Sequence, residues 1–470
     1  MKQSRIEHDL LGEREVPADR YYGIQTLRAL ENFQITGIPI SHTPRLVNSL
    51  AYIKKAAARA NAQLGLLPQS IADAICKACD EILAGKFHQE FVVDVIQGGA
   101  GTSTNMNANE VIANIALELL GHEKGRYDVI HPLNHVNMSQ STNDVYPSAL
   151  RLTLSQKLDG LMREMEGLQI ALAAKGKEFA DVIKMGRTQL QDAVPMTLGQ
   201  EFEAYAVMVG EDIQRVQEAQ SLIREINMGA TAIGTGLNAH PQYASLVTKL
   251  IREISGIPVI ESTNLVEATQ DTGAYVQLSG VLKRVATKLS KICNDLRLLT
   301  SGPRAGFGEI NLPPMAPGSS IMPGKVNPII PEVVNQVAFE VIGNDITVTM
   351  AAEAGQLELN VMEPIIAYNL FSSLDILGRA CRTLTERCIK GITANRERCR
   401  MFVEHSIGLV TALNPIIGYE KSTEIAHEAF ETGKSVYEIV LEKGYLSKTE
   451  LDDILLPENM TRPRYLHKNE

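Results

Sequence analysis

Four stretches of the chain repeat an apolar residue at alternating steps of four and three, the spacing that places one stripe along an α-helix. The first stripe is Leu154, Leu158, Leu161, Met165, Leu168 and Leu172. The others run from Phe202 to Val216, from Leu278 to Leu299 and from Leu370 to Cys388. A further helix, about 331–350, carries Val334, Val337 and Val341. Five long helices with such stripes predict an all-α fold built on an antiparallel helix bundle.

The 470-residue chain is long enough for several domains. We predict a mostly helical amino-terminal domain at 1–140, a central long-helix domain that carries the polar motifs at 141–394, and a small helical carboxy-terminal domain at 395–470. With 45 Lys and Arg against 55 Asp and Glu and no basic block, no nucleic-acid partner is expected. The amino-terminal segment mixes charges, and nowhere do 18 apolar residues follow one another, so we expect a cytoplasmic protein with no membrane partner.

The six cysteines are scattered through segments predicted to be helical, which argues against a disulfide framework. Cys76 and Cys79 have the CxxC spacing, but the flanking residues form one amphipathic helix and no second pair completes a zinc site. Metal or redox use is the alternative interpretation. Buried free cysteine that packs as a small hydrophobic residue is the commoner case.

Segments rich in small polar residues and glycine lie between the predicted helices. They are GGAGTSTNMNANE (98–110), NMSQSTND (137–144), KMGRTQLQDAVP (184–195), GATAIGTGLN (229–238) and SGPRAGFGEINLPPMAPGSSIMPGKVNP (301–328). Each supplies hydroxyls, amides and backbone N–H groups near helix ends, where anions bind well. Residues 141–144 alone could form only an N-terminal capping box. Together the segments indicate a common ligand.

The stretch GSSIMPGKVNP (318–328) places two serines, a lysine and an asparagine among glycines and prolines. Gly318 allows the backbone to approach a ligand closely, while Pro323, Gly324 and Pro328 exclude a regular helix. We therefore predict an ordered loop or lid. A simple Gly/Ser connector is the alternative.

These motifs together resemble the fumarase/aspartase superfamily over essentially the whole chain, and QSTND (140–144) and AAEAGQLELNVMEP (351–364) are similar to its aspartase branch. The resemblance implies an all-α fold of three domains and a homotetramer whose central helices merge into one bundle. It also implies the reversible conversion of L-aspartate to fumarate and ammonia. Hydration of fumarate to L-malate is the nearest alternative. A catalytically silent structural homologue is another, but it would require a broken site, and the site residues are present.

Removing a proton from the carbon beside the β-carboxylate gives a doubly charged aci-carboxylate, so donors preorganised around that group supply much of the stabilisation. The resemblance assigns Ser319 as the general base, acting as an oxyanion. It also assigns substrate contacts: Thr102, Ser141, Thr142 and Ser320 at the β-carboxylate, Lys325 and Asn327 at the α-carboxylate, and Asn143, Thr188 and Gln189 near the amino group. The alternatives are a turn residue for Asn327 and a solvated surface lysine for Lys325.

Gln189 stands where fumarases typically carry His. Hydroxide needs a proton donor to leave, whereas the ammonium of aspartate leaves as neutral ammonia without one, so a residue that cannot titrate favours ammonia over water. The run His131-Pro132-Leu133-Asn134 departs from the fumarase His-Pro-Asn-Asp run, which puts a secondary carboxylate site in doubt. No cluster of metal ligands is visible. We therefore expect no required cofactor, and activation by a divalent cation, known in some aspartases, stays open.

Thr142 lies just before the first long helix and Gln189 just after it, so roughly 50 Å of helix separates them at 1.5 Å per residue. The second helix returns and the third goes back, which places Ser319 at the same end as Gln189. We therefore expect each active site to combine segments from different subunits and the isolated monomer to be inactive.

Overall fold

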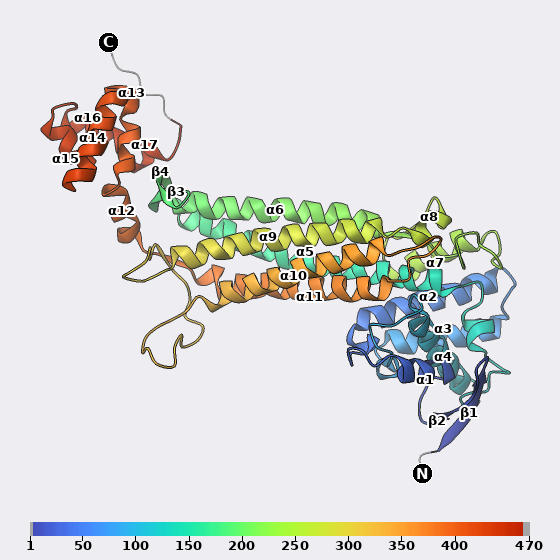
Figure 1. The fold of residues 1–470 in the computed structure, drawn as a ribbon. Coiled ribbons are helices and arrows are strands. Elements are labelled where there is room, and N and C mark those ends of the chain that lie inside the picture. Colours follow the sequence, from blue (N-terminus) through green and yellow to red (C-terminus); the bar gives the residue numbers. More distant parts are fainter. Residues whose placement is uncertain (1–2, 464–470) are drawn as a thin grey trace. The chain divides into compact units, whose positions relative to one another are not determined.

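The computed structural model describes residues 3–463, and helices account for most of it (Figure 1). The chain divides into two compact units. The first contains Met1–Met162, Gln214–Ala286 and Phe339–Gly378, and the second contains Arg163–Ile213, Thr287–Ala338 and Arg379–Glu470. Each unit is thus assembled from three separate stretches of chain. The predicted boundaries at 140 and 394 divide the chain in a different way and stay a prediction.

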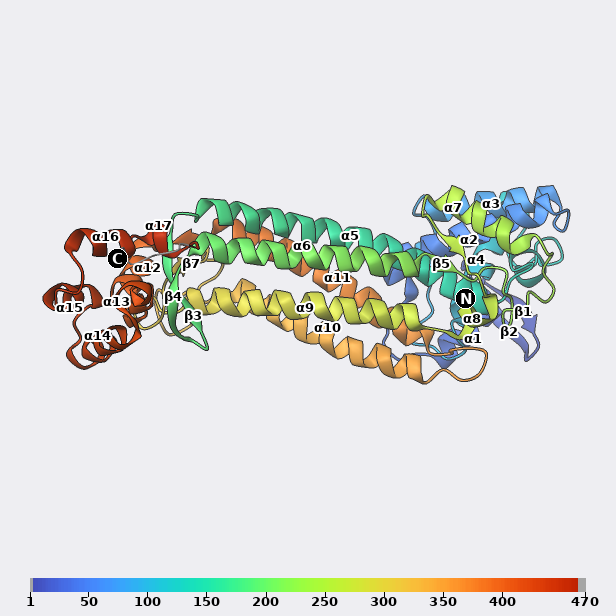
Figure 2. The same ribbon diagram turned by 90° about the horizontal axis from the view of Figure 1, so that it is seen from above.

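Five long helices contribute residues to both units (Figure 1, Figure 2). They are α5 (Thr142–Glu178), α6 (Leu198–Ile223), α9 (Gly273–Leu299), α10 (Ile329–Glu353) and α11 (Glu363–Arg387). Every residue named above from the stripe on α5 is buried, and Val334 and Val341 of α10 are buried whereas Val337 is half-buried. The helical spacing of the apolar residues therefore predicted both the helices and their buried faces.

Polar side chains also join neighbouring helices inside the first unit. Gln220 of α6 donates to Asp159 of α5 with a distance of 2.7 Å between Nε2 and Oδ1. Asn344 of α10 donates to Ser373 of α11 at 3.1 Å. In the second unit, Asn335 of α10 donates to the Ser290 hydroxyl of α9 at 2.9 Å. These bonds fix the rotation of each helix about its axis, which apolar packing alone specifies less strictly.

The remaining elements of the first unit are shorter. They are β1 (Ser4–Asp9), β2 (Gly12–Pro17), α1 (Ile24–Asn32), α2 (Pro44–Gln63), α3 (Gln69–Leu83), α4 (Thr102–Leu119), β5 (Glu225–Ile226), α7 (Tyr243–Ser255), β6 (Ile260–Glu261) and α8 (Leu265–Gln270). Cys76 and Cys79 lie on α3 as predicted, and all six cysteines are free. The interpretation of the CxxC spacing as part of an amphipathic helix is therefore confirmed.

The second unit carries the carboxy-terminal helices. Its shorter elements are β3 (Ile183–Thr188), β4 (Gln191–Thr197), β7 (Ile310–Asn311), β8 (Thr393–Ala394), α12 (Arg396–Glu404), α13 (Asn414–Ile417), α14 (Tyr419–Thr432), α15 (Val436–Glu442), α16 (Lys448–Ile454) and α17 (Pro457–Met460). Met185 of β3 is buried in one hydrophobic core with Ile425, Ile439 and Leu451 of the terminal helices. The hairpin of β3 and β4 is therefore held by this core.

The strands pair only two by two: β1 with β2, β3 with β4, β5 with β6, and β7 with β8. The all-α class is confirmed, although the sequence pattern does not predict these short strands. None of the helices within residues 3–463 combines the length and the apolar character needed to cross a lipid bilayer.

Candidate active site

The helix α5 begins at Thr142, and the buried Asp144 carboxylate holds the residues around this start in place. Asp144 accepts hydrogen bonds from the backbone N–H groups of Ser141, Gly229 and Thr231 at 3.0, 3.1 and 3.0 Å. Burial raises the pKa of Asp144 to about 7, against the effect of these N–H donors and of Lys54. The capping alternative is thus correct for Asp144 and for Ser141, whose Oγ accepts a hydrogen bond from the Asn143 N–H at 3.2 Å. The Thr142 hydroxyl lies outside this cap.

The Thr142 hydroxyl is hydrogen-bonded to a layer of buried and half-buried amide side chains. Its Oγ1 accepts a hydrogen bond from Asn105 Nδ2 on α4 at 3.1 Å, and the same Nδ2 donates to Asn137 Oδ1 at 3.1 Å. Lys54 donates from below to Asn137 Oδ1 and Gln140 Oε1, each at 2.9 Å. Burial lowers the pKa of the Lys54 ammonium to about 7, partly offset by Asp144. Thr142 is therefore supported by a connected polar layer with a basic group at its centre.

The other two predicted residues of this unit lie beside that layer. Thr102 is the first residue of α4, one turn before Asn105, and its hydroxyl donates to the Gly99 carbonyl at 2.7 Å. Asn143 donates from Nδ2 to the Ala232 carbonyl at 2.7 Å. The structure therefore brings Thr102, Ser141, Thr142 and Asn143 to neighbouring helix starts.

The glycine-rich turn before α4 packs directly on α5. Gly101 has a φ of +87°, and a Cβ atom there would lie 2.4 Å from the ring of Tyr146. Only glycine allows this approach. The contact fixes the start of α4, with Thr102, against the start of α5.

Thr188 and Gln189 lie at the tip of the β3–β4 hairpin. Thr188 pairs with Gln191, so Gln189 and Leu190 form a two-residue turn, and their φ angles are +54° and +62°. Both residues are exposed. Two left-handed residues are the mark of a type I′ turn, which usually contains Asn-Gly. The sequence does not predict the hairpin because this signal is absent.

The loop around Ser319 is closed at its neck by two hydrogen bonds. The Gly318 N–H donates to the Lys325 carbonyl at 2.7 Å, and Asn327 Nδ2 donates to the Gly318 carbonyl at 2.6 Å. A Cβ atom on Gly318 would lie 2.4 Å from the Lys325 oxygen, so the neck requires glycine. Asn327 has the structural role that the alternative interpretation gave it, while its second amide N–H is not used by that bond.

The Ser319 hydroxyl is already surrounded by hydrogen-bond donors. Its Oγ accepts from the backbone N–H groups of Ile321 at 3.2 Å and Met322 at 2.9 Å. Hydrogen bonds to the charged form of a group favour that form, so these donors favour a serine oxyanion. Ser320 and Lys325 are exposed, and Ile321 is 83% exposed at the tip.

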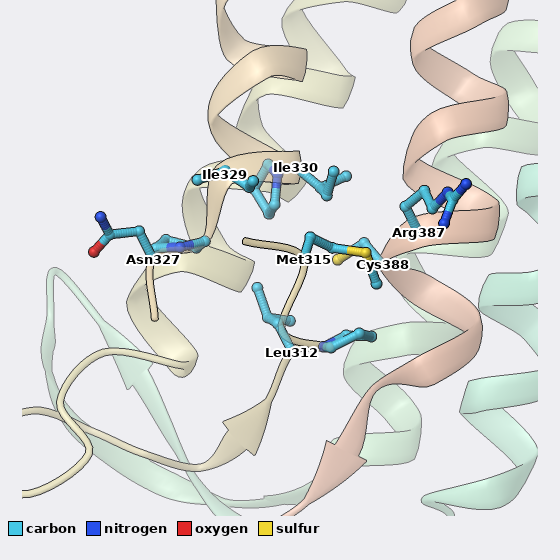
Figure 3. Close-up of a pocket in the computed structure, with 10 residues that line it drawn as sticks. Leu312, Met315, Asn327, Ile329, Ile330, Arg387 and Cys388 are labelled. Atoms are coloured by element: carbon cyan, nitrogen blue, oxygen red, sulfur yellow. The ribbon is translucent and has the colours of Figure 1, made fainter. Parts of the chain in front are cut away.

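The base of the loop is anchored in an apolar crease (Figure 3). Leu312 and Met315 before the loop and Ile329 after it meet Arg387 and Cys388 at the end of α11. The crease has a volume of about 10 Å³, enough for no more than a water molecule. It is a packing seam that holds both ends of the loop, not a substrate pocket.

The structure thus divides the predicted site residues between the two units. Thr102, Ser141, Thr142 and Asn143 belong to the first unit, and the remaining six belong to the second: Thr188, Gln189, Ser319, Ser320, Lys325 and Asn327. Across residues 3–463, no three His, Cys, Asp or Glu side chains gather in a way that could hold a metal ion.

The His131–Asn134 run is used for local structure. His131 Nδ1 accepts hydrogen bonds from the N–H groups of Leu133 and Asn134 at 3.0 and 3.2 Å, and His135 Nδ1 accepts from the His131 N–H at 2.9 Å. Burial and the neighbouring His135 lower the pKa of His131. Nδ1 of both His131 and His135 therefore accepts hydrogen bonds from backbone N–H groups.

Comparison with known proteins agrees with this architecture. A family model described as lyase matches residues 12–343, and one described as fumarase C C-terminus matches 409–462. A fumarate lyase:delta crystallin from Brucella melitensis, solved bound to cobalt, superposes with a TM-score of 0.96 at 57% identity, over 98% of this chain and 100% of that one. A class II fumarase from Schistosoma mansoni superposes with a TM-score of 0.93 at 37% identity, over 98% and 100%.

Curated relatives are similar over nearly their whole length. The aspartate ammonia-lyase of Pseudomonas aeruginosa is 63% identical over 98% of both chains. That of Helicobacter pylori (strain J99) is 62% identical over 99% of this chain and 100% of the relative, and that of Escherichia coli (strain K12) is 56% identical over 99% and 97%. The resemblance found in the sequence is thereby confirmed, and the chain belongs to the aspartate ammonia-lyase family of the fumarase/aspartase superfamily.

Proposed function

We propose that this chain is a carbon–nitrogen lyase that interconverts L-aspartate with fumarate and ammonia. One observation carries the proposal: relatives named aspartate ammonia-lyase are 56 to 63% identical over nearly the whole chain, whereas the class II fumarase is 37% identical. Gln189 adds chemical support, because an amide cannot give the proton that a leaving hydroxide needs. A cytoplasmic location is part of the proposal.

In the proposed mechanism, Ser319 removes the proton from the carbon beside the β-carboxylate. The N–H groups of Ile321 and Met322 favour the oxyanion that this role requires, and the Lys325 ammonium adds positive charge when the loop covers the substrate. Charge then accumulates on the β-carboxylate as the aci-carboxylate forms. Donors held in place before the reaction stabilise that charge most effectively.

The other predicted site residues bind different parts of the substrate. Ser141, Thr142 and Ser320 donate to the β-carboxylate, and Thr102 does so when its O–H turns away from the Gly99 carbonyl. Lys325 and the free N–H of Asn327 hold the α-carboxylate, and Asn143, Thr188 and Gln189 surround the amino group. No cofactor is needed for this chemistry, because the base and the donors are protein groups. We therefore expect turnover to persist in EDTA, and any stimulation on adding a divalent cation would be activation, not a requirement.

We further propose a homotetramer with shared active sites. The 37 residues of α5 span about 55 Å at 1.5 Å per residue, with Thr142 at the first residue and Gln189 beyond the last. The helix α10 is apolar on more than one face, because it buries Val334 and Val341 but also exposes Phe339, Ile346 and Met350 by 60 to 68%. A helix that is apolar all round is typically buried on all sides, which a second copy of the chain would provide.

The assay that tests the function compares two incubations of the purified protein. Fumarate with ammonium should yield aspartate, and fumarate alone should yield no malate. Malate without ammonium would show a fumarate hydratase instead. Absence of both products, in protein that is folded and tetrameric, would indicate a silent structural homologue.

A further inference from the structure

A buried cluster of four charged side chains lies behind the turn that carries Thr188 and Gln189. It consists of Lys184 and Arg187 on β3, Glu201 on α6, and Glu309 just before β7. Arg187 Nη1 lies 2.7 Å from Glu309 Oε1, Lys184 Nζ lies 3.2 Å from Glu309 Oε2, and Lys184 Nζ lies 2.5 Å from Glu201 Oε2. The Glu309 side chain has no exposed surface. We call these four residues the hairpin charge cluster.

The charges in the hairpin charge cluster balance, with two cations and two anions. A buried charge that loses its partner is strongly unfavourable, whereas removal of both partners of a pair is far better tolerated. Lys184 lies between Glu201 and Glu309, so it would retain one carboxylate if Glu309 were neutralised. Arg187 is held by Glu309 alone among the carboxylates of the cluster. Neutralising Glu309 therefore affects Arg187 more than Lys184.

Glu309 itself is fixed by the backbone on both sides. Its N–H donates to the Leu299 carbonyl at the end of α9, and its carbonyl accepts from the Asn395 N–H, each at 2.9 Å. The Arg187 guanidinium lies over the rings of Phe307 and Phe402, 4.1 and 5.3 Å from their centroids. The end of β3 is thus clamped to a segment that cannot easily move.

Arg187 is the residue directly before Thr188. The register of the hairpin shifts between Met185 and Arg187, and Gln189 adopts a left-handed backbone that is strained for a residue other than glycine. A strained turn keeps its conformation only where its surroundings hold it. The clamped Arg187 provides that hold two residues before Gln189.

We propose that the Arg187–Glu309 ion pair is a positioning device for the amino-group end of the substrate. It fixes the turn so that Thr188 and Gln189 receive the ammonium of aspartate or, in the reverse reaction, ammonia. The inference rests on the proposed function. It makes a selective prediction, because the carboxylates of fumarate are assigned to other residues. Loss of the pair should weaken the use of ammonia and leave the binding of fumarate almost unchanged.

The test uses the reverse reaction with Glu309→Gln, Arg187→Gln and the double variant in the full-length chain. Each single variant should raise the KM for ammonium roughly tenfold, with the KM for fumarate within about twofold of the wild type. The double variant should raise the KM for ammonium by no more than either single variant does, because each single change already removes the pair. An equal rise in both KM values, or additive effects in the double variant, would overturn the proposal.

Asp212→Asn is the matched control. Asp212 is a buried carboxylate of the same unit, 3.1 Å from Lys288, and it lies on α6 away from the hairpin. The Asp212→Asn variant should lower the melting temperature, and any change in the KM for ammonium should equal the change in the KM for fumarate. If Glu309→Gln does not fold, Arg187→Lys replaces it in the test. Lysine keeps the charge but loses the planar guanidinium and its contacts with the rings. This variant should also raise the KM for ammonium more than the KM for fumarate, but by a smaller factor. A wild type that makes no aspartate would reject the proposed function, whereas an active wild type with unselective variants rejects only this inference.

Discussion

The two groups of site residues are held in very different ways. The Thr142 hydroxyl is bound by Asn105, which is bound in turn to Asn137, and the buried Lys54 holds that amide from below. The Ser319 loop is tied at its neck and at its base, while its tip is open to solvent. In the proposed mechanism, the first group is a preformed receptor for a carboxylate. The second group carries the proposed base on a segment with few contacts of its own, as segments that close over a substrate do.

Replacing the base should have the largest effect. Ser319→Ala should lower kcat by at least about a thousandfold, which is within the range that general bases contribute. The KM for aspartate and the oligomeric state should change little, because the carboxylate donors remain. The measurement is steady-state deamination, followed by fumarate absorbance. A variant that kept more than a few per cent of the wild-type rate would show that the base lies elsewhere.

The neck of the loop is the next test. Gly318→Ala places a methyl group 2.4 Å from the Lys325 oxygen, so the neck must open, and we expect kcat to fall on the order of a hundredfold. Gly324→Ala in the same loop is the control. Gly324 has a φ of +80° but open space around its Cβ position, so the expected cost is only about 1 kcal/mol of strain. Equal losses in the two variants would mean that the neck does not position the base.

Lys325→Ala should lower kcat/KM for aspartate by about 10- to 100-fold, the range for a hydrogen bond to a charged group. Both KM and kcat should change, because the proposed mechanism places the Lys325 ammonium at the α-carboxylate before and during the reaction. Lys249→Ala on α7 removes another exposed lysine and serves as the control. An unchanged KM for Lys325→Ala would support the surface-lysine interpretation.

Substitutions that affect the first group of site residues, which contains Thr142, should lower the activity less. Asn105→Ala removes the donor to Thr142, and we expect kcat/KM to fall about 5- to 10-fold, the effect of one hydrogen bond between neutral groups. Asn344→Ala removes an amide-to-hydroxyl bond of the same 3.1 Å length between α10 and α11. That control should lower the melting temperature and leave the kinetics unchanged. A loss as large as that of Gly318→Ala would show that the two groups do not differ in the way described.

Much of the fold could be predicted from the sequence because the helices are long and their apolar spacing repeats over many turns. The stripe from Leu154 to Leu172 is buried throughout, and the flexible segment around Ser319 could be recognised from its glycines and prolines. The β3–β4 hairpin could not, because its turn is Gln189-Leu190 instead of a glycine-containing pair.

The layers that support the site were also missed. Lys54 bonds to Asn137, 83 residues away, and Arg187 pairs with Glu309, 122 residues away. Neither pair follows a repeating spacing or a local sequence motif, so a single sequence does not reveal it. Lys54 in particular lies among alanines on α2, where the helical pattern alone predicts only packing.

The central claim is that each active site takes Thr142 from one chain and Ser319 from another, and mixing two inactive variants tests it most directly. Thr142→Ala and Ser319→Ala are denatured together in equal amounts and refolded, beside each variant and the wild type refolded alone. A mixture of Gly318→Ala and Ser319→Ala, with both changes in one loop, is the control that should stay inactive. We predict that the first mixture regains roughly a quarter of the wild-type activity, since random assortment gives about one site in four an intact copy of each residue. A mixture that stays as inactive as its parents, while the wild type refolds well, would contradict the shared site.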